Sequence, residues 1–200
     1  MWINAIVYFM KEAIGLTAIG LNVLGMVPYV ISIYRGKTKP HLFSNIIWAI
    51  VTALAFFGQV IKGAGPGAWT TGIATLFTIY TCVLAIKYGT KDVTKLDYFF
   101  LVLGLLSIIP WILTDDPTIS VVMATFIDAC GFAPTIRKTW NDPKSENLFS
   151  WVINLIRHGL SMFAMRNFVL ATYIYPLALF FMNIATILVI LRGKIKPDKV

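Results

Sequence analysis

Polar side chains at helical spacing in an otherwise apolar stretch are the first candidates for chemistry in this chain. Segment 148–165 is largely apolar, but five polar residues recur in it at intervals of three or four positions. They are Ser150, Asn154, Arg157, His158 and Ser161. This spacing predicts that they share one face of a helix. A guanidinium, an imidazole and an amide on one face offer hydrogen bonds to a small polar solute.

A second polar face is predicted in segment 42–62. It carries Ser44, Trp48, Thr52 and Gln59, again at helical spacing. The Trp48 ring could stack on a sugar face or another flat ligand. The two faces predict one central cavity, with Trp48, Thr52, Asn154 and His158 as substrate-binding residues. The alternative interpretation is that the small polar side chains hydrogen-bond between neighbouring helices.

Asp128 and Arg157 are the two ionisable residues predicted at similar depth inside apolar segments. Asp128 lies ten residues before the end of segment 118–138, and Arg157 nine after the start of segment 148–165. A charge inside a membrane helix costs about 2.5–3.5 kcal/mol on insertion scales, so an ion pair between them is expected. The pair could be a structural clamp. Alternatively, Asp128 binds a proton or a cationic group whose affinity Arg157 adjusts.

The sequence offers no constellation for metal, cofactor or covalent chemistry. Cys82 and Cys130 lie in apolar segments, and no Cys and His ligand cluster, carboxylate pair or nucleophile triad accompanies them. Segment 169–191 has no lysine that could form a retinal Schiff base. We therefore predict no metal, no cofactor and no enzyme activity.

The elements that must position these residues are membrane helices. Of the 200 residues, 58% are hydrophobic and 13% charged, against about 25% charged in a typical soluble domain. A spanning helix needs roughly 20 mostly apolar residues. Seven segments fit this description: 13–34, 42–62, 68–86, 97–114, 118–138, 148–165 and 169–191. The predicted fold is an all-α membrane protein of seven transmembrane helices.

The basic residues fall mainly on one side of this predicted topology. Alternating loops place thirteen lysines and arginines on one side and only Lys11, Lys62 and Arg166 on the other. The positive-inside rule then puts the N-terminus outside and the C-terminus in the cytoplasm of a cell membrane. The net charge of +8 is explained by this bias, so no nucleic-acid partner is predicted. The apolar stretch Trp2–Met10 is expected to be a separate short segment at the interface.

An internal repeat accompanies this topology. Gly25, Pro28, Leu42, Phe43, Ser44 and Leu54 recur 106 residues later as Gly131, Pro134, Leu148, Phe149, Ser150 and Leu160. The same register pairs Asn22 with Asp128. Each repeat has three spans, an odd number, so two adjoining repeats would insert in opposite orientations. One extra span between them gives both repeats the same orientation. We therefore predict repeats at 1–92 and 117–200, with a linker helix at 93–116.

The segments GMVPYVISIYRGKTKPHLFS and GFAPTIRKTWNDPKSENLFS, in a three-one-three helix plan, resemble the SWEET and PQ-loop transporter family. SWEETs are built from parallel repeats related by an axis along the membrane normal. The resemblance implies transport of a small polar solute by alternating access, with a sugar as the family default. It implies that Asn183 belongs to the binding pocket. Pro28 and Pro134 each remove a helix hydrogen bond and can kink the chain, so in a transporter they are predicted hinges; the alternative is a static bend.

Two alternatives remain open beside a sugar carrier. Asp128 and Arg157 favour a proton-coupled carrier of an amino acid or vitamin-like solute over a neutral sugar. A membrane receptor that binds without transport would share the architecture, as KDEL receptors do. The predicted partners are the lipid bilayer and a small polar solute, and a homo-oligomer is compatible with this plan.

The charge bias predicts which loops an impermeant thiol reagent reaches in intact cells. Single cysteines placed in 36–40 or 193–199 should stay unlabelled until the membrane is permeabilised, because both regions are predicted to be cytoplasmic. A cysteine at 115 or 116 should be labelled at once and serves as the control. Labelling of 36–40 from outside would contradict the topology and the repeat together.

Overall fold

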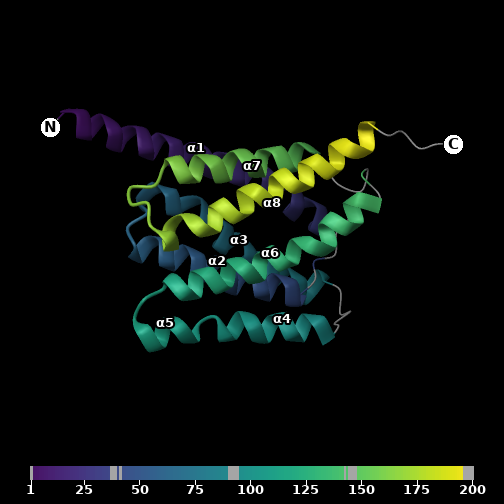
Figure 1. Ribbon diagram of the computed structural model, residues 1–200. Helices are drawn as coiled ribbons and strands as arrows, with labels where there is room; N and C mark the ends of the chain where they lie inside the picture. The colour runs from purple at the N-terminus through teal and green to yellow at the C-terminus, as the bar shows by residue number, and fades with distance from the viewer. Residues whose placement is uncertain are drawn as a thin grey trace.

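Every regular element in the described part of the chain is a helix. The computed structural model describes residues 2–36, 40, 42–89, 95–141, 143 and 148–195. The helices are α1 (Trp2–Tyr34), α2 (Leu42–Ile61), the 3-10 helix η1 (Gly65–Ala68), α3 (Trp69–Tyr88), α4 (Lys95–Leu106), α5 (Ile109–Thr114), α6 (Thr118–Asn141), α7 (Leu148–Phe163) and α8 (Leu170–Ile195). They run along one common direction and form an elongated bundle (Figure 1).

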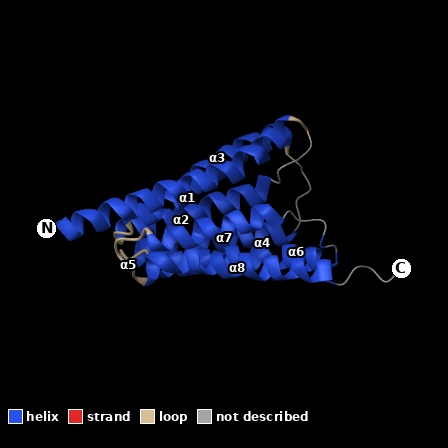
Figure 2. Ribbon diagram, turned by 90° about the horizontal axis from the view of Figure 1, so that it is seen from above, coloured by secondary structure: helices blue, strands red, loops and turns tan. Residues whose placement is uncertain are grey.

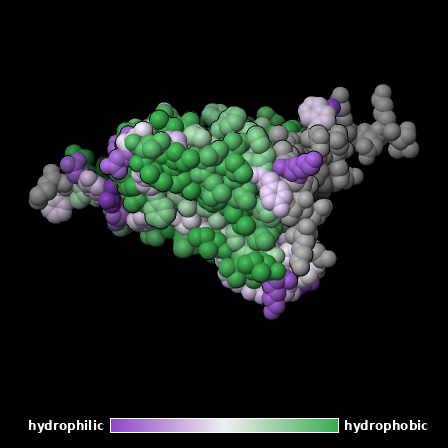
Figure 3. Space-filling model, turned by 90° about the horizontal axis from the view of Figure 1, so that it is seen from below, coloured by the Kyte–Doolittle hydropathy of each residue, from purple (hydrophilic) through white to green (hydrophobic). Residues whose placement is uncertain are grey.

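The bundle has the surface of a membrane-associated protein. Four helical stretches are long and apolar enough to cross a bilayer: Trp2–Tyr34, Leu42–Ile61, Gly65–Tyr88 and Leu170–Arg192. Shorter apolar helices cover Leu101–Thr114 and Thr118–Cys130. Large apolar side chains such as Leu76, Ile112 and Phe126 are more than 60% exposed. Figure 3 shows hydrophobic surface over most of the face that bears α4 and α5. The prediction of an all-helical membrane protein is confirmed to the extent that the described residues form a membrane-associated helical bundle.

Six of the seven predicted segments coincide with one helix each, but the fourth does not. Segment 97–114 is divided into α4 and α5 at Ser107 and Ile108. Proline lacks a backbone N–H, so Pro110 cannot donate to the carbonyl four residues earlier, and the helix restarts around it. The Trp111 backbone N–H donates to Ser120 Oγ at 3.0 Å, which holds α5 against α6. The segment predicted as the linker helix thus consists of two short helices joined by a two-residue turn.

The first helix is longer than predicted. α1 spans 33 residues, about 50 Å at 1.5 Å per residue, and includes the stretch expected to form a separate interfacial segment. Lys11 and Glu12 do not interrupt it because both are paired at its surface. The Lys11 ammonium donates to the Met165 carbonyl, and Glu12 binds Arg166 at 2.7 Å. The separate segment is thus a wrong prediction.

The helices form two triplets with the same packing order. α3 packs between α1 and α2, and α8 packs between α6 and α7. The triplets meet through α1 against α7 and through α2 against α6, so the first helix of each lies on the second helix of the other. The α4–α5 pair packs outside this bundle, against α2 and α6. In Figure 2, α1 and α3 lean together away from the remaining helices.

The largest apolar core lies where the two triplets meet. It joins α2, α6 and α8 through Ile47, Val51, Leu54, Ala55, Val121, Ala124, Ile127, Tyr175 and Leu179. Gly58 permits the close approach of α2 to α6, because a Cβ there would overlap the Val121 Cγ2 methyl. Small residues at helix contacts are the usual way for membrane helices to approach.

We therefore expect Gly58→Ala to lower the unfolding temperature of the detergent-purified protein. Overpacking of this kind costs about 1–3 kcal/mol, and Val121→Ala in the same chain should restore part of the loss. Gly20→Ala is the matched control, since no atom lies within 4 Å of the added methyl and Ala is the better helix former. Equal melting temperatures for the two alanine variants would contradict the close approach.

Candidate functional site

A buried cluster of titratable side chains occupies the second triplet. Asp128 of α6 is 8% exposed and accepts a hydrogen bond from the Tyr175 hydroxyl of α8, with 3.0 Å between Tyr175 Oη and Asp128 Oδ2. Arg157 of α7 lies close enough to interact electrostatically with both groups. His158, beside Arg157 on α7, is also buried. Three helices thus bring one carboxyl, one phenol and one guanidinium together.

The predicted ion pair between Asp128 and Arg157 is absent from this cluster. Within the described residues, ion pairs closer than 4 Å join Lys62 to Asp116 and Arg166 to Glu12 only. Asp128 instead binds Tyr175, because α8 packs against both α6 and α7. The similar depth of Asp128 and Arg157 along their helices brings the two groups near each other. Depth alone does not fix the rotation of a helix about its axis.

Arg157 uses a small part of its hydrogen-bonding capacity. Its Nε donates to Asn154 Oδ1 one turn earlier, at 2.8 Å. A guanidinium has five N–H donors, and the rest make no hydrogen bond to a described residue. The side chain is half-buried. Asn154 therefore orients Arg157 and leaves donors for a further polar group.

Asn183 provides a second unused polar atom. Its side-chain N–H donates to the Leu179 carbonyl of its own helix at 2.6 Å, and the residue is 2% exposed. The amide oxygen has no hydrogen-bond partner among the described residues. A buried unpaired amide oxygen costs roughly 1–3 kcal/mol, so a bound solute or water that donated to it would be stabilised.

The remaining predicted site residues lie in the first triplet and do not join the cluster. Asn22 of α1 donates to the Thr70 carbonyl of α3 at 3.0 Å. Thr52 contacts Thr78 of α3 at 3.2 Å between the hydroxyl oxygens. Trp48 is 43% exposed, and its carbonyl accepts a hydrogen bond from Thr52. These contacts fit the alternative interpretation, in which small polar groups join neighbouring helices.

The two predicted hinge prolines fall inside helices. Pro28 lies within α1, six residues before its end. Position 134 lies within α6, and its side chain is outside the described residues. Their role as hinges stays a prediction.

Tyr175 is the site residue that sequence reasoning missed. It lies on the same helical face as Asn183 and Thr186, which follow it by eight and eleven residues and are likewise buried. That periodicity was the signal that could have found it. An isolated tyrosine next to Pro176 resembles an interfacial anchor instead.

One end of the bundle is held together by polar contacts between the two triplets. We call it the Arg166 end, and it comprises residues 11–12, 59–68, 115–118 and 161–172. Gln59 donates to the Thr172 carbonyl at 3.0 Å, and Ser161 donates to the Gly67 carbonyl at 2.7 Å. The Arg166 backbone N–H donates to the Ala64 carbonyl at 2.9 Å. These bonds join α2 with α8 and α7 with η1.

The three basic residues of this end are all engaged. Lys11 binds the Met165 carbonyl, Arg166 binds Glu12, and Lys62 binds Asp116 at 2.9 Å. The Thr118 hydroxyl and backbone N–H, together with Lys62, lower the pKa of Asp116 to about 2, so this carboxylate stays ionised at neutral pH. Arg166 also lies over the Tyr8 ring, with 4.7 Å between guanidinium and centroid.

Polar contacts between described residues at the opposite end run within the triplets. We call this the basic end, because Arg35, Lys87, Lys95 and Arg192 lie there. Tyr34 of α1 and Tyr80 of α3 share a hydrogen bond of 2.7 Å. Thr81 of α3 donates to Asn45 of α2 at 2.5 Å. Arg192 of α8 lies 3.4 Å from the Trp140 ring centroid of α6.

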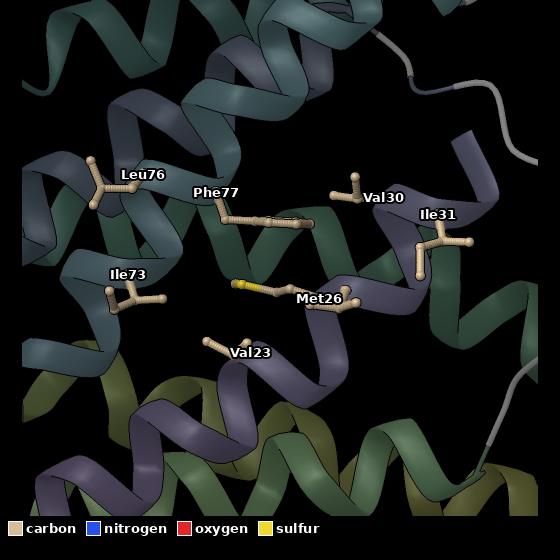
Figure 4. Close-up of a pocket in the computed structure, with 8 residues that line it drawn as sticks. Val23, Met26, Val30, Ile31, Ile73, Leu76 and Phe77 are labelled. Carbon is tan, nitrogen blue, oxygen red and sulfur yellow. The ribbon is translucent and has the colours of Figure 1, made fainter. Parts of the chain in front are cut away.

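A cavity of about 380 Å³ between α1 and α3 is unsuited to a polar solute. Its walls carry Val23, Met26, Val27, Val30, Ile31, Ile73, Leu76 and Phe77, and no polar side chain (Figure 4). Several of these residues face the surface, including Leu76 at 64% exposure. The described polar side chains with unused hydrogen-bonding atoms lie elsewhere, at Arg157, Asn183, Gln59 and Thr70.

The fold and this cluster define a membrane-associated helical bundle with a buried polar site in one triplet. Comparison with models of protein families, with characterised proteins and with solved structures finds no match for this chain. The resemblance to SWEET and PQ-loop transporters therefore stays a prediction.

A double-mutant cycle on Asp128 and Tyr175 tests the cluster. Tyr175→Phe should lower stability by about 1.5–3 kcal/mol in thermal unfolding, because it removes a buried hydrogen bond to a charged acceptor. Adding Asp128→Asn should cost less than the sum of the single changes, since the groups interact directly. The coupling between Asp128→Asn and Arg157→Gln should be weaker. Tyr173→Phe, two residues away with its ring stacked on Phe168, is the control. Additive losses for Asp128 and Tyr175 would refute the contact.

Proposed function

We propose that this protein is a membrane transporter that moves a small polar solute by alternating access between two three-helix repeats. The observation that carries the proposal is the set of polar contacts that joins the two triplets at the Arg166 end. Between described residues, hydrogen bonds join the two triplets at the Arg166 end, from Gln59 to Thr172 and from Ser161 to Gly67. Contacts of this kind are expected at the closed end of a carrier.

The packing order supports the repeat. In both triplets the third helix lies between the first and second, and the triplets meet in a reciprocal way. Symmetric halves related by an axis along the membrane normal have this property. The seven helical segments, counting α4 with α5 as one, then all cross the membrane, with the basic end in the cytoplasm.

Equivalent polar contacts support the same register. Asn22 and Asp128 are 106 residues apart, and each binds the third helix of its own triplet. Their partners are Thr70 and Tyr175, which differ by 105 residues, within one residue of the repeat interval. The repeat was defined from sequence matches alone. Equivalent contacts in the two triplets therefore support it in addition to those matches.

The site favours a solute with hydrogen-bonding or anionic groups. Arg157 presents unused donors, and Asn183 presents an unused acceptor. A sugar, the family default, has hydroxyl groups that could bind to either residue. Asp128, an ionisable group held by a phenol inside the bundle, favours the alternative of a proton-coupled amino acid or vitamin-like solute. A receptor of the same fold would bind the solute without moving it.

Uptake into proteoliposomes tests this function directly. Purified protein should accelerate entry of at least one solute from a panel of labelled sugars, amino acids and vitamins. Arg157→Gln should reduce that uptake by about tenfold or more while the protein still folds, since one lost hydrogen bond to a charged group is worth about 1.5–3 kcal/mol. Saturable binding without uptake of any solute would favour the receptor and contradict transport.

Cross-linking at the Arg166 end tests alternating access. In a chain without Cys82 and Cys130, Glu12→Cys with Arg166→Cys should stop uptake when bridged by a reducible thiol cross-linker, because the triplets can no longer separate there. Reduction should restore uptake. Asn45→Cys with Thr81→Cys is the matched control, since this bridge joins α2 and α3 within one triplet and should leave uptake intact. Full uptake with the Glu12–Arg166 bridge in place would overturn the mechanism.

A further inference from the structure

The face of α2 that carries Trp48 is directed toward the second triplet. Trp48 and Gln59 are eleven residues apart, about three turns of helix, so their side chains lie on one face. Gln59 is fully buried and donates to the Thr172 carbonyl of α8. Trp48, nearer the basic end, is 43% exposed. This face is therefore closed against the second triplet at Gln59 and accessible at Trp48.

The face of α7 that carries Asn154 is directed toward the first triplet in the same way. Asn154 and Ser161 are seven residues apart, about two turns of helix. Ser161 is buried and donates to the Gly67 carbonyl of η1. Asn154 is partly exposed, and its side-chain oxygen accepts a hydrogen bond from Arg157 Nε at 2.8 Å. This bond holds the Arg157 guanidinium beside a face that is directed at the other triplet.

Trp48 and Asn154 lie at similar depth in the bundle. Both α2 and α7 begin at the basic end, and each of the two residues is six positions after the first residue of its helix, about 9 Å along the axis. The two helices belong to different triplets and do not pack closely on each other. An indole ring and a guanidinium anchored by Asn154 therefore flank the space between the triplets at one level.

The two faces differ in chemistry although they are equivalent in the repeat. Asn154 and Arg157 correspond, at the interval of 106 residues, to Trp48 and Val51. Val51 is fully buried in the apolar core. At these positions the second triplet offers charge and hydrogen bonds, and the first offers apolar and aromatic surface. A solute that contacts both faces needs a polar group at one end and an apolar body at the other.

The polar group that fits Arg157 is an anion. Asp128 accepts its hydrogen bond from Tyr175, and in the described part of the chain no carboxylate lies within 4 Å of the Arg157 guanidinium. A carboxylate supplies the counter-charge and two parallel hydrogen bonds to the guanidinium, which a neutral sugar hydroxyl cannot do.

We propose that the solute is a carboxylate with an aromatic body, whose carboxylate binds Arg157 and whose ring packs on Trp48. This inference rests on the proposed function, because it takes the space between the triplets as the path of the solute. Asp128 Oδ1 makes no hydrogen bond to a described residue, so an aromatic acid with or without an ammonium group shares this chemistry.

Equilibrium binding to the detergent-purified full chain tests the solute class separately from transport. The probes are labelled phenylpropionate and phenylalanine, and the comparisons are phenylpropanamide, a neutral molecule of the same shape, and glucose. At least one of the two acids should bind about tenfold or more tighter than either comparison, because only the acids carry a charge for Arg157. Binding of the amide or of glucose that equals or exceeds binding of both acids would overturn the inference.

Two substitutions separate the roles of the charge and the ring. Arg157→Gln should weaken binding of the acid about tenfold or more and leave binding of the amide within about twofold. Arg157→Lys keeps the charge and should keep the preference for acid over amide. Trp48→Leu should weaken both ligands about fivefold, because both have the ring, and Trp2→Leu at the exposed start of α1 is its control.

The outcomes distinguish this inference from the proposed function. Equal losses of acid and amide in both Arg157 variants, or unchanged acid binding in Trp48→Leu, would overturn the assignment of these residues. Uptake of a sugar into proteoliposomes without binding of either acid would overturn the solute class and leave transport standing. Acid binding that depends on Arg157, without uptake of any solute, would contradict transport and support the ligand class.

Discussion

The structure depends on the requirement that polar groups in a hydrocarbon environment find partners within the protein. Helices meet this requirement for the backbone, and several buried polar side chains bind carbonyls or polar groups of other helices. Asn22 donates to the Thr70 carbonyl in the first turn of α3, and Gln59 donates to the Thr172 carbonyl in the first turn of α8. Ser161 donates to the Gly67 carbonyl in η1. With few apolar driving forces between helices in lipid, these bonds and close packing at Gly58 determine which helices meet.

The same requirement explains the polar contacts at the Arg166 end. There, η1 and the first turn of α8 present carbonyls that the opposite triplet can reach. The ion pairs there are partly exposed, and such pairs typically contribute less than about 1 kcal/mol each. Several modest contacts of this kind together join the two triplets at this end.

The buried cluster illustrates how the fold converts single residues into a site. Asp128, Tyr175 and Arg157 come from three helices, and each would be costly in isolation. Because α8 packs against both α6 and α7, its tyrosine reaches Asp128 and binds it in place of a direct ion pair. Arg157 consequently keeps donors that a salt bridge would have used. The arrangement is therefore available to a ligand, which a tightly closed ion pair would not be.

The sequence by itself determined the helical class, six of the seven helical segments and the depth of the charged residues. These follow from length, hydropathy and a rise of 1.5 Å per residue, all of which are local properties. Pro110 also carried the information that breaks the linker, although the apolar pattern around it predicted one helix.

Only the tertiary structure decided that Asp128 binds Tyr175, that Asn22 and Thr52 pack within the first triplet, and that α1 continues to Trp2. Each outcome depends on the rotation and neighbours of a helix. Those are set by contacts between residues such as Lys11 and Met165, 154 positions apart, which periodicity within one segment cannot encode.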